Sequence, residues 1–226
     1  MYEIIIGDRM FSSWSMRGWL MLEKFNIPYK IRMVGLYAGT MQQDMADLSP
    51  AKTVPALRTP AGTILSDSVS IAETLAEENP HAGLWPADPA ARAMARNLVA
   101  EMHASFLPLR DECTNILGFV WKNFKPSQAA QKDVARIEYL WALSKEQYGR
   151  KDSPWLFGDY SLADVFYAPI ACRFVTYGLD ISDASQSYVN AHLKDEAFLN
   201  WRAEAMKEVH DPFPYNLPYE RDAWPN

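Results

Sequence analysis

The sequence predicts two unlike parts, a mixed α/β domain followed by an all-helical domain. Strand-like runs, either continuously apolar or alternating with period two, are confined to the first 65 residues. After Asp88-Pro89, a cap followed by a first-turn proline, only helical periodicity is found. A length of 226 residues suits a pair of compact domains. We place them at residues 1–80 and 88–226, joined by a linker that Trp85 pins.

The first domain is expected to begin with a strand, a helix and a second strand. Three consecutive isoleucines, Ile4 to Ile6, leave residues 2–6 no polar face and indicate a strand buried on both sides. Residues 15–26 carry an apolar helical face and end at Asn26, shortly before Pro28. Residues 29–33 alternate with period two, as a half-exposed strand does. Such a βαβ unit is right-handed by rule.

The rest of the first domain predicts a short helix, a hairpin and a longer helix. The short helix falls near residues 41–46, within an irregular stretch. Residues 56–59 and 63–65 flank Pro60-Ala61-Gly62, a turn sequence that favours an antiparallel hairpin. A helix from Ser68 to Glu78 is stopped by Asn79-Pro80. The order βαβ, loop helix, ββα is that of the thioredoxin-like fold.

The second domain is expected to contain helices only. Residues 91–121 predict one long helix kinked at Pro108, followed by helices near 127–148, 161–177, 182–193 and 196–209. Ser161 and Asp164 have the spacing of a helix-start box, which we interpret as structural. The tail, residues 211–226, holds four prolines and four aromatic residues and is expected to pack back on the body.

Composition excludes several classes of function. With 28 acidic and 22 basic residues the net charge is −6, which argues against nucleic acid or an anionic membrane as a main partner. Cys113 and Cys172 are the only cysteines, and the four histidines show no paired spacing, so neither a disulfide framework nor a metal site is expected. No run approaches the ~20 apolar residues of a membrane span, and no signal-peptide pattern is present, so a cytoplasmic protein is expected.

A hydroxyl-rich turn, residues 11–17, lies between the first strand and the first helix. Ser12, Ser13 and Ser15 would bring hydroxyl and free backbone N–H groups to one spot, which stabilises an anion such as a thiolate or carboxylate. Taken alone, these serines are better explained as one helix cap and two solvated side chains. The motifs Val54-Pro55 and Asp67-Ser68 follow in the chain and favour the first interpretation.

Taken together, these motifs and the Gly158-to-Asp164 box resemble the cytosolic glutathione S-transferases over almost the whole chain. The stretch Ser12-Ser13-Trp14-Ser15 is most similar to the serine-type loop of the zeta class and its bacterial relatives. The resemblance implies a transferase, with a detoxifying role, that joins the glutathione thiol to small electrophiles. It also implies that the protein is a homodimer. Glutathione would be a substrate, and no metal cofactor is implied.

The resemblance assigns the glutathione site to particular residues. Ser12 is implied as the hydrogen-bond partner of the thiolate, with Ser13 and Ser15 as neighbours that could share or replace it. Val54 before a cis Pro55 would meet the cysteinyl part. Asp67 would face the γ-glutamyl ammonium and Ser68 its carboxylate. Lys52 is a candidate for the glycyl carboxylate, and a solvated lysine is an equal alternative.

A second-substrate pocket for a small hydrophobic electrophile is expected between the domains, lined by Met10, Phe11, Trp14, Met102, Phe106 and Arg110. Zeta enzymes that isomerise maleylacetoacetate carry an arginine about a dozen residues beyond the box, whereas here Arg173 lies nine residues beyond Asp164. A maleylacetoacetate-type cis-trans isomerase therefore stays an alternative. A weakly catalytic glutathione-binding module is the rival from another class.

Overall fold

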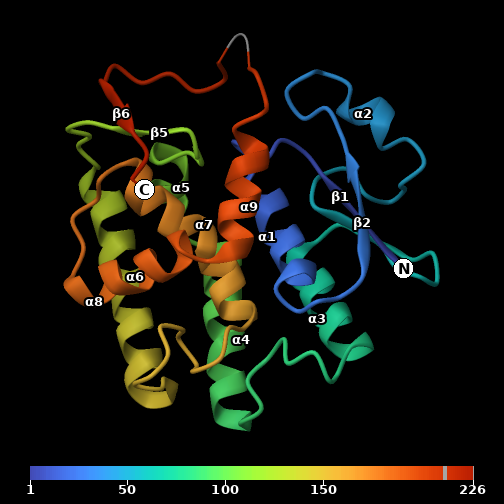
Figure 1. The fold of residues 1–226 in the computed structure, drawn as a ribbon, viewed down its shortest axis with the longest axis horizontal. Coiled ribbons are helices and arrows are strands. Elements are labelled where there is room, and N and C mark those ends of the chain that lie inside the picture. Colours follow the sequence, from blue (N-terminus) through green and yellow to red (C-terminus); the bar gives the residue numbers. More distant parts are fainter. Residues whose placement is uncertain (211–212, 226) are drawn as a thin grey trace.

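The structure, a computed structural model, describes residues 1–210 and 213–225. Its first domain has the predicted order of elements (Figure 1): β1 (Tyr2–Ile6), α1 (Ser13–Glu23), β2 (Tyr29–Met33), α2 (Met41–Asp44), β3 (Ala56–Arg58), β4 (Ile64–Leu65) and α3 (Ser68–Glu78). The sheet order is β2-β1-β3-β4. β1 is parallel to β2 and antiparallel to β3, and β3 pairs with β4 as the predicted hairpin. The thioredoxin-like arrangement is thus confirmed.

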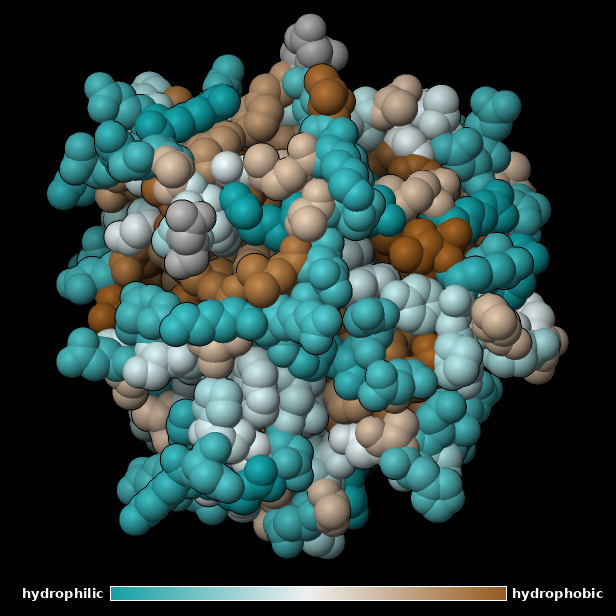
Figure 2. All heavy atoms as spheres, viewed as in Figure 1, coloured by the Kyte–Doolittle hydropathy of each residue, from teal (hydrophilic) through white to brown (hydrophobic). Residues whose placement is uncertain are grey.

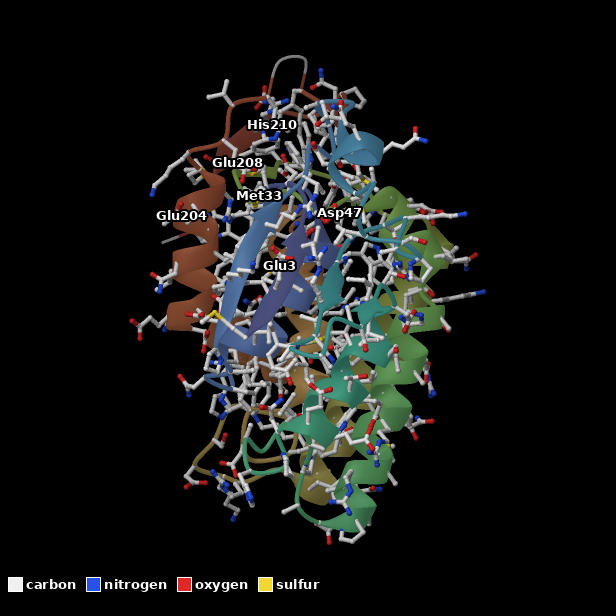
Figure 3. The ribbon with its side chains drawn as sticks, turned by 90° about the vertical axis from the view of Figure 1, so that its right-hand side faces the viewer. Glu3, Met33, Asp47, Glu204, Glu208 and His210 are labelled. Carbon is white, nitrogen blue, oxygen red and sulfur yellow. The ribbon has the colours of Figure 1, made fainter. Side chains whose placement is uncertain are left out.

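The central strand β1 is buried on both faces, as its isoleucines predict. Ile4, Ile5 and Ile6 are all 0% exposed. Ile4 and Ile6 join the main core, which continues into the second domain, whereas Ile5 packs in a smaller core on the other face of the sheet. β2 is an edge strand, and its basic side chains form ion pairs: Lys30 pairs with Glu3 and Arg32 with Asp47, two of the acids labelled in Figure 3.

The second domain consists mainly of helices: α4 (Pro89–Ala104), α5 (Leu107–Glu112), α6 (Gln128–Tyr148), α7 (Leu162–Thr176), α8 (Asp183–Leu193) and α9 (Glu196–Ala205). Helix α7 is its centre, because α1, α4 and α8 all pack against it. Every residue of α7 except Val175 is buried. Figure 1 shows α1 and α9 side by side where the two domains meet.

The predicted single helix over residues 91–121 is wrong. Helix α4 ends at Ala104, Ser105 is extended, and Phe106 has a left-handed backbone with φ 62°. Pro108 lies in the first turn of α5, where it needs no N–H partner. In a continuous helix its ring would clash with the carbonyl of Ala104, four residues earlier. The proline therefore separates two helices instead of kinking one.

The expectation of a strand-free second domain is also wrong. Residues Phe119–Trp121 form β5, which pairs antiparallel with β6 (Arg221–Ala223) from the tail. This two-stranded sheet brings together segments about a hundred residues apart, so no local pattern signals it. The described part of the tail packs on the body, as expected, and Trp224 is only 7% exposed.

The linker is held by Leu84 as well as by Trp85, which packs against the main core. Leu84 is 2% exposed, and its carbonyl accepts a hydrogen bond from the Leu162 backbone N–H at 2.9 Å. Trp85 is half-buried beneath the guanidinium of Arg96. The first residue of α7 therefore anchors the connection between the domains.

Apolar side chains gather on the surface beside the C-terminus. Figure 2 shows this hydrophobic patch over the region of α7 to α9 on an otherwise largely hydrophilic face. A cavity of about 400 Å³ lies there, lined by residues that include Phe174, Leu179, Val189, Phe198 and Trp224. None of its lining residues belongs to the serine turn.

Candidate functional site

The serine turn caps helix α1. The Ser12 hydroxyl oxygen accepts a hydrogen bond from the Ser15 backbone N–H at 3.1 Å and lies 2.8 Å from the Ser15 hydroxyl oxygen. The Ser15 hydroxyl in turn accepts from the Gly7 backbone N–H at 2.9 Å. A short hydroxyl chain therefore connects the end of β1 to the first turn of α1, where unpaired N–H groups favour negative charge.

The three serines face different surroundings. Ser12 lines a cavity, Ser15 is fully buried beneath it, and the Ser13 hydroxyl accepts from the Arg173 guanidinium of the second domain at 3.2 Å. Only Ser12 is therefore placed to meet a ligand in that cavity.

The cavity holds about 380 Å³ and lies where the sequence motifs meet. Its lining combines Ser12, Val54, Pro55, Asp67 and Ser68 with Trp14, Leu36, Met41, Thr53, Ser66 and His103. Of the other residues singled out in the sequence, Lys52 is exposed beside it, and Met10, Phe11, Met102 and Phe106 are nearly fully buried away from it. Arg110 lies with its guanidinium 5.0 Å from the Trp14 ring centroid.

The Val54–Pro55 peptide bond is cis, as the resemblance implies. Pro55 rests on α1 at Gly18, where an added Cβ would lie 2.5 Å from the Pro55 Cβ and 2.8 Å from its Cγ. Real Cβ atoms do not approach so closely. Gly18 is therefore required by the fit between the helix and the proline loop, a role that sequence reasoning did not assign.

We predict that Gly18→Ala lowers stability although alanine is the better helix former. The proline ring has no rotamer that moves it away, so overpacking should lower the free energy of unfolding by about 1–3 kcal/mol. The displaced Val54–Pro55 segment should also weaken ligand binding in the cavity. Gly118→Ala is the control, since its Cβ would meet only the flexible Met10 end at 3.4 Å. A calorimetric melting temperature for Gly18→Ala at or above that of the unsubstituted protein would contradict the prediction.

Asp67 and Ser68 begin helix α3 at the cavity. The Asp67 carboxylate accepts from the backbone N–H groups of Val69 and Ser70 at 2.8 and 3.0 Å. His103, from α4, lies 3.3 Å from the free Asp67 oxygen through Nε2 and 3.4 Å from the Ser68 hydroxyl through Nδ1. The second domain therefore reaches this end of the cavity, through a histidine that no sequence motif marked.

Three arginines meet next to the cavity. The Arg17 guanidinium is 2% exposed, lies 4.4 Å from the ring centroids of both Trp14 and Phe166, and donates to the Ser68 hydroxyl at 3.5 Å. Burial, then the charges of Arg110 and Arg173, lower the pKa of Arg17 to about 9. Burial and Arg110 lower the pKa of Arg173 to about 10.

These arginines carry an uncompensated positive charge. Among the residues the structure describes, none of the three has a carboxylate within the 4.0 Å of an ion pair. Arg173 instead donates to the carbonyls of Cys113 and Pro169, and Arg110 to those of His103 and Ser105. Mutual repulsion and burial oppose their charged forms. An anion bound nearby would stabilise them.

The arrangement suits an anionic ligand. Helices α1 and α3 both begin at the cavity, so the positive ends of two helix dipoles favour negative charge there. Ser12 offers a hydroxyl to such a ligand, and Val54 and Pro55 line the same cavity. Asp67 is the one carboxylate in the lining.

Comparison with known proteins assigns the first domain to a family. Residues 11–78 match the glutathione S-transferase N-terminal domain family. The chain thus carries a glutathione S-transferase N-terminal domain, followed by a helical domain in the fold of that family.

Particular relatives agree with this class. A Burkholderia glutathione transferase homologue solved with bound glutathione superposes with a TM-score of 0.68 at 23% identity, covering 92% of this chain and 99% of that one. Glutathione transferase Omega 3C from Trametes versicolor has a TM-score of 0.66 at 22% identity and covers 88% of each chain.

Two curated proteins are similar in sequence over most of the chain. One, from Caenorhabditis elegans, is described as a probable maleylacetoacetate isomerase and is 27% identical over 172 residues, 75% of this chain and 77% of its own. The other is a stringent starvation protein A homologue from Haemophilus ducreyi, 25% identical over 175 residues, 77% of this chain and 76% of its own.

Proposed function

We propose that the protein is a glutathione transferase that stabilises the glutathione thiolate through Ser12 and conjugates it to small electrophiles. One observation carries the proposal: Ser12, the Val54–Pro55 segment and the Asp67–Ser68 pair line the same cavity, although they lie on three separate loops. The homologue with bound glutathione supports the choice of ligand. A free thiol has a pKa of about 8.5, so the site must favour the thiolate to act near neutral pH.

Each part of glutathione has a proposed partner. Ser12 donates to the thiolate, and the backbone of Val54 pairs with the cysteinyl unit. Asp67 binds the γ-glutamyl ammonium, which replaces His103 as the partner of its carboxylate. Ser68 and the start of α3 bind the γ-glutamyl carboxylate. Arg17, which donates to Ser68, adds positive charge there. Lys52, exposed beside Thr53, is proposed to reach the glycyl carboxylate.

Asp67→Asn should weaken glutathione binding about five- to thirtyfold. The neutral amide no longer attracts the ammonium group of glutathione by charge, and the loss is moderate because water partly screens this contact. Asparagine keeps the helix cap, so the fold should be unaffected. Asp88→Asn is the matched control: Asp88 caps α4 through the Ala91 N–H at 2.8 Å, outside the cavity. Titration calorimetry measures both. Equal affinities for Asp67→Asn and the unsubstituted protein would exclude this role for Asp67.

A second candidate, a glutathione-dependent cis-trans isomerase, is favoured by the three arginines. Their uncompensated charge suits a second substrate that carries carboxylates, and the Caenorhabditis elegans relative is described as such an isomerase. Turnover of an activated aryl halide and isomerisation of a cis-enone dicarboxylate distinguish the two activities. Tight glutathione binding without turnover of either substrate would favour a binding module.

We further propose that the protein acts as a cytoplasmic homodimer in detoxification. In the part of the chain that the structure describes, no helix is both long and apolar enough to cross a membrane. Sedimentation of a ~26 kDa species at micromolar concentration would contradict the dimer.

A further inference from the structure

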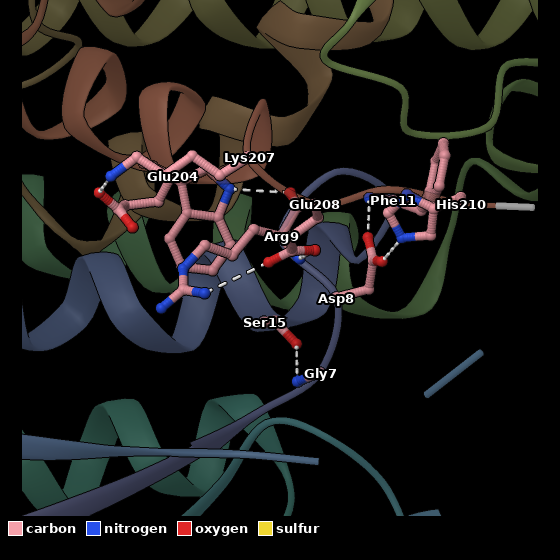
Figure 4. Close-up of polar contacts among 10 residues, drawn as sticks. Gly7, Asp8, Arg9, Phe11, Ser15, Glu204, Lys207, Glu208 and His210 are labelled. Atoms are coloured by element: carbon pink, nitrogen blue, oxygen red, sulfur yellow. Dashed lines mark hydrogen bonds and ion pairs between the residues drawn. The ribbon is translucent and has the colours of Figure 1, made fainter. Parts of the chain in front are cut away.

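The segment after α9 contacts the turn that carries Ser12. We call Glu208, His210, Phe213 and Tyr215 the C-terminal clasp. Figure 3 shows Glu208 and His210 close together at one end of the molecule, and Figure 4 shows them facing Arg9 and Asp8 of the loop between β1 and α1. The clasp and the turn are about two hundred residues apart in sequence.

Arg9 is bound by the second domain through its backbone N–H, its carbonyl and its guanidinium. Its backbone N–H donates to Glu208 Oε2 at 3.1 Å, and its guanidinium pairs with Glu208 Oε1 at 3.2 Å. Its carbonyl accepts from the Trp201 indole N–H of α9 at 3.1 Å. The loop therefore cannot move at Arg9 without breaking contacts to α9 and the clasp.

Asp8 closes the serine turn and is itself held by the clasp. One carboxylate oxygen accepts from the Phe11 backbone N–H at 2.7 Å, and the Asp8 carbonyl accepts from the Ser12 N–H at 3.1 Å. The other carboxylate oxygen pairs with His210 Nε2. Asp8 is only 8% exposed, so water competes little for these contacts.

The Phe11 ring completes the attachment. It is 4% exposed, and the rings of His210, Phe213, Tyr37 and Tyr215 all present edge-on contacts to it, at centroid distances of 4.6 to 5.6 Å. The hydroxyls of Tyr37 and Tyr215 are hydrogen-bonded at 2.7 Å. Edge-to-face pairs of this kind fix ring position as well as burying area.

We propose that the C-terminal clasp is a positioning device, which holds the Asp8–Ser12 turn and so places the Ser12 hydroxyl at the cavity. Asp8, Arg9 and Phe11 are each held by a clasp side chain, and Ser12 follows Phe11 directly. The proposal rests on the function proposed above, because it concerns the reaction of Ser12. His210, Glu208 and Phe213 act through the turn and do not touch the ligand.

The clasp works through direct side-chain contacts and not through a bound cation. Asp8, Glu208 and His210 place potential ligand atoms within 4.8 Å of one another, the spacing of a metal site. Both carboxylates, however, already have partners: Arg9 pairs with Glu208, while His210 and the Phe11 N–H pair with Asp8. The Arg9 guanidinium also supplies positive charge where an ion would bind.

Hydrogen exchange of the ligand-free protein tests the clasp without reference to activity. His210→Ala and Phe213→Ala should each raise amide exchange of residues 9–12 about tenfold or more, the effect of losing one good contact, and leave residues 16–23 unchanged. Val209→Ala is the control, because this neighbouring side chain is 92% exposed. Unchanged exchange at residues 9–12, or an equal rise in both segments, would overturn the proposal.

Glutathione titration then tests the consequence for Ser12. In His210→Ala the pKa of the bound thiol, followed by thiolate absorbance, should rise with little loss of affinity. An unshifted thiol would overturn the positioning role. A protein that binds no glutathione would refute the proposed function, while the exchange comparison would still decide whether the clasp holds the turn. Faster exchange at residues 9–12 after treatment with EDTA would show a cation at the clasp and overturn the view that direct side-chain contacts hold the turn.

Discussion

Replacing Asp164 by alanine is expected to lower the free energy of unfolding by about 3–5 kcal/mol, because several buried donors would lose their acceptor at once. The carboxylate is 0% exposed. It accepts from the backbone N–H groups of Leu156 and Ser161, the Ser161 hydroxyl and the Tyr188 hydroxyl, at 2.8 to 3.2 Å. A helix cap alone would account for only about 1–2 kcal/mol.

The environment of Asp164 explains why the loss should be large. Burial raises the pKa of Asp164 to about 6, and the four hydrogen bonds oppose that rise. These bonds tie together the loop before α7, the start of α7 and helix α8, so alanine would loosen all three. The effect should be read from chemical denaturation, with glutathione affinity measured under conditions where the variant is folded.

Asp159→Ala is the control, because this neighbouring acid is 86% exposed and pairs only with Arg150 at the surface. Its effect should stay within about 0.5 kcal/mol. If Asp164→Ala kept its stability but lost glutathione affinity, the structural role of Asp164 would be wrong and a place in the site would be indicated.

The second large effect is expected for Ser12→Ala, with a ten- to hundredfold loss of turnover at neutral pH. One hydrogen bond from a hydroxyl to an anion contributes roughly 1.5–3 kcal/mol. Without it the pKa of the bound thiol rises, so a smaller fraction is ionised at neutral pH. The loss should therefore shrink as pH rises through the thiol pKa. Glutathione affinity should fall much less than turnover.

The Ser12–Ser15 pair explains how Ser12 becomes free to donate. In the structure the Ser12 hydroxyl donates to the Ser15 hydroxyl oxygen at 2.8 Å, and rotation of both hydroxyl hydrogens would reverse this bond. If Ser15 donates to Ser12, the Ser12 hydrogen is released for the thiolate, while the Gly7 N–H continues to hold Ser15. Ser12 also caps α1, so Ser12→Ala should lower stability by about 1 kcal/mol as well.

Ser13→Ala and Ser15→Ala are the controls for this assignment. Ser13→Ala removes the acceptor of Arg173 but should leave the bound thiol unshifted. Ser15→Ala leaves the Gly7 N–H unpaired in the core and should act mainly on stability. Thiolate absorbance of bound glutathione against pH compares all three variants. A shift confined to Ser15→Ala would move the thiolate partner to the helix start.

The sequence predicted the order of elements wherever a local signal was present. The isoleucine run gives β1, the Pro60-Ala61-Gly62 turn joins β3 and β4, and Ser127 and Gly149 bound α6. The prediction failed at Ser105 and Phe106, because the helical spacing of apolar residues continues where the backbone leaves the helix. It also missed β5 and β6, because strand pairing across a hundred residues leaves no local trace.

For the site, the sequence alone determined which loops matter, since Ser12, Pro55 and Asp67 stand at the ends of elements that local patterns define. Only the tertiary structure decided which serine faces the cavity. Ser13 and Ser15 lie one and three residues after Ser12, and the packing around the helix start determines which of the three side chains points to the cavity. The meeting of Arg17 with Arg110 and Arg173 was likewise beyond the sequence, as were the roles of His103, Gly18 and the C-terminal clasp. Each acts through a contact with a distant segment, and such contacts depend on how the two domains and the tail pack together.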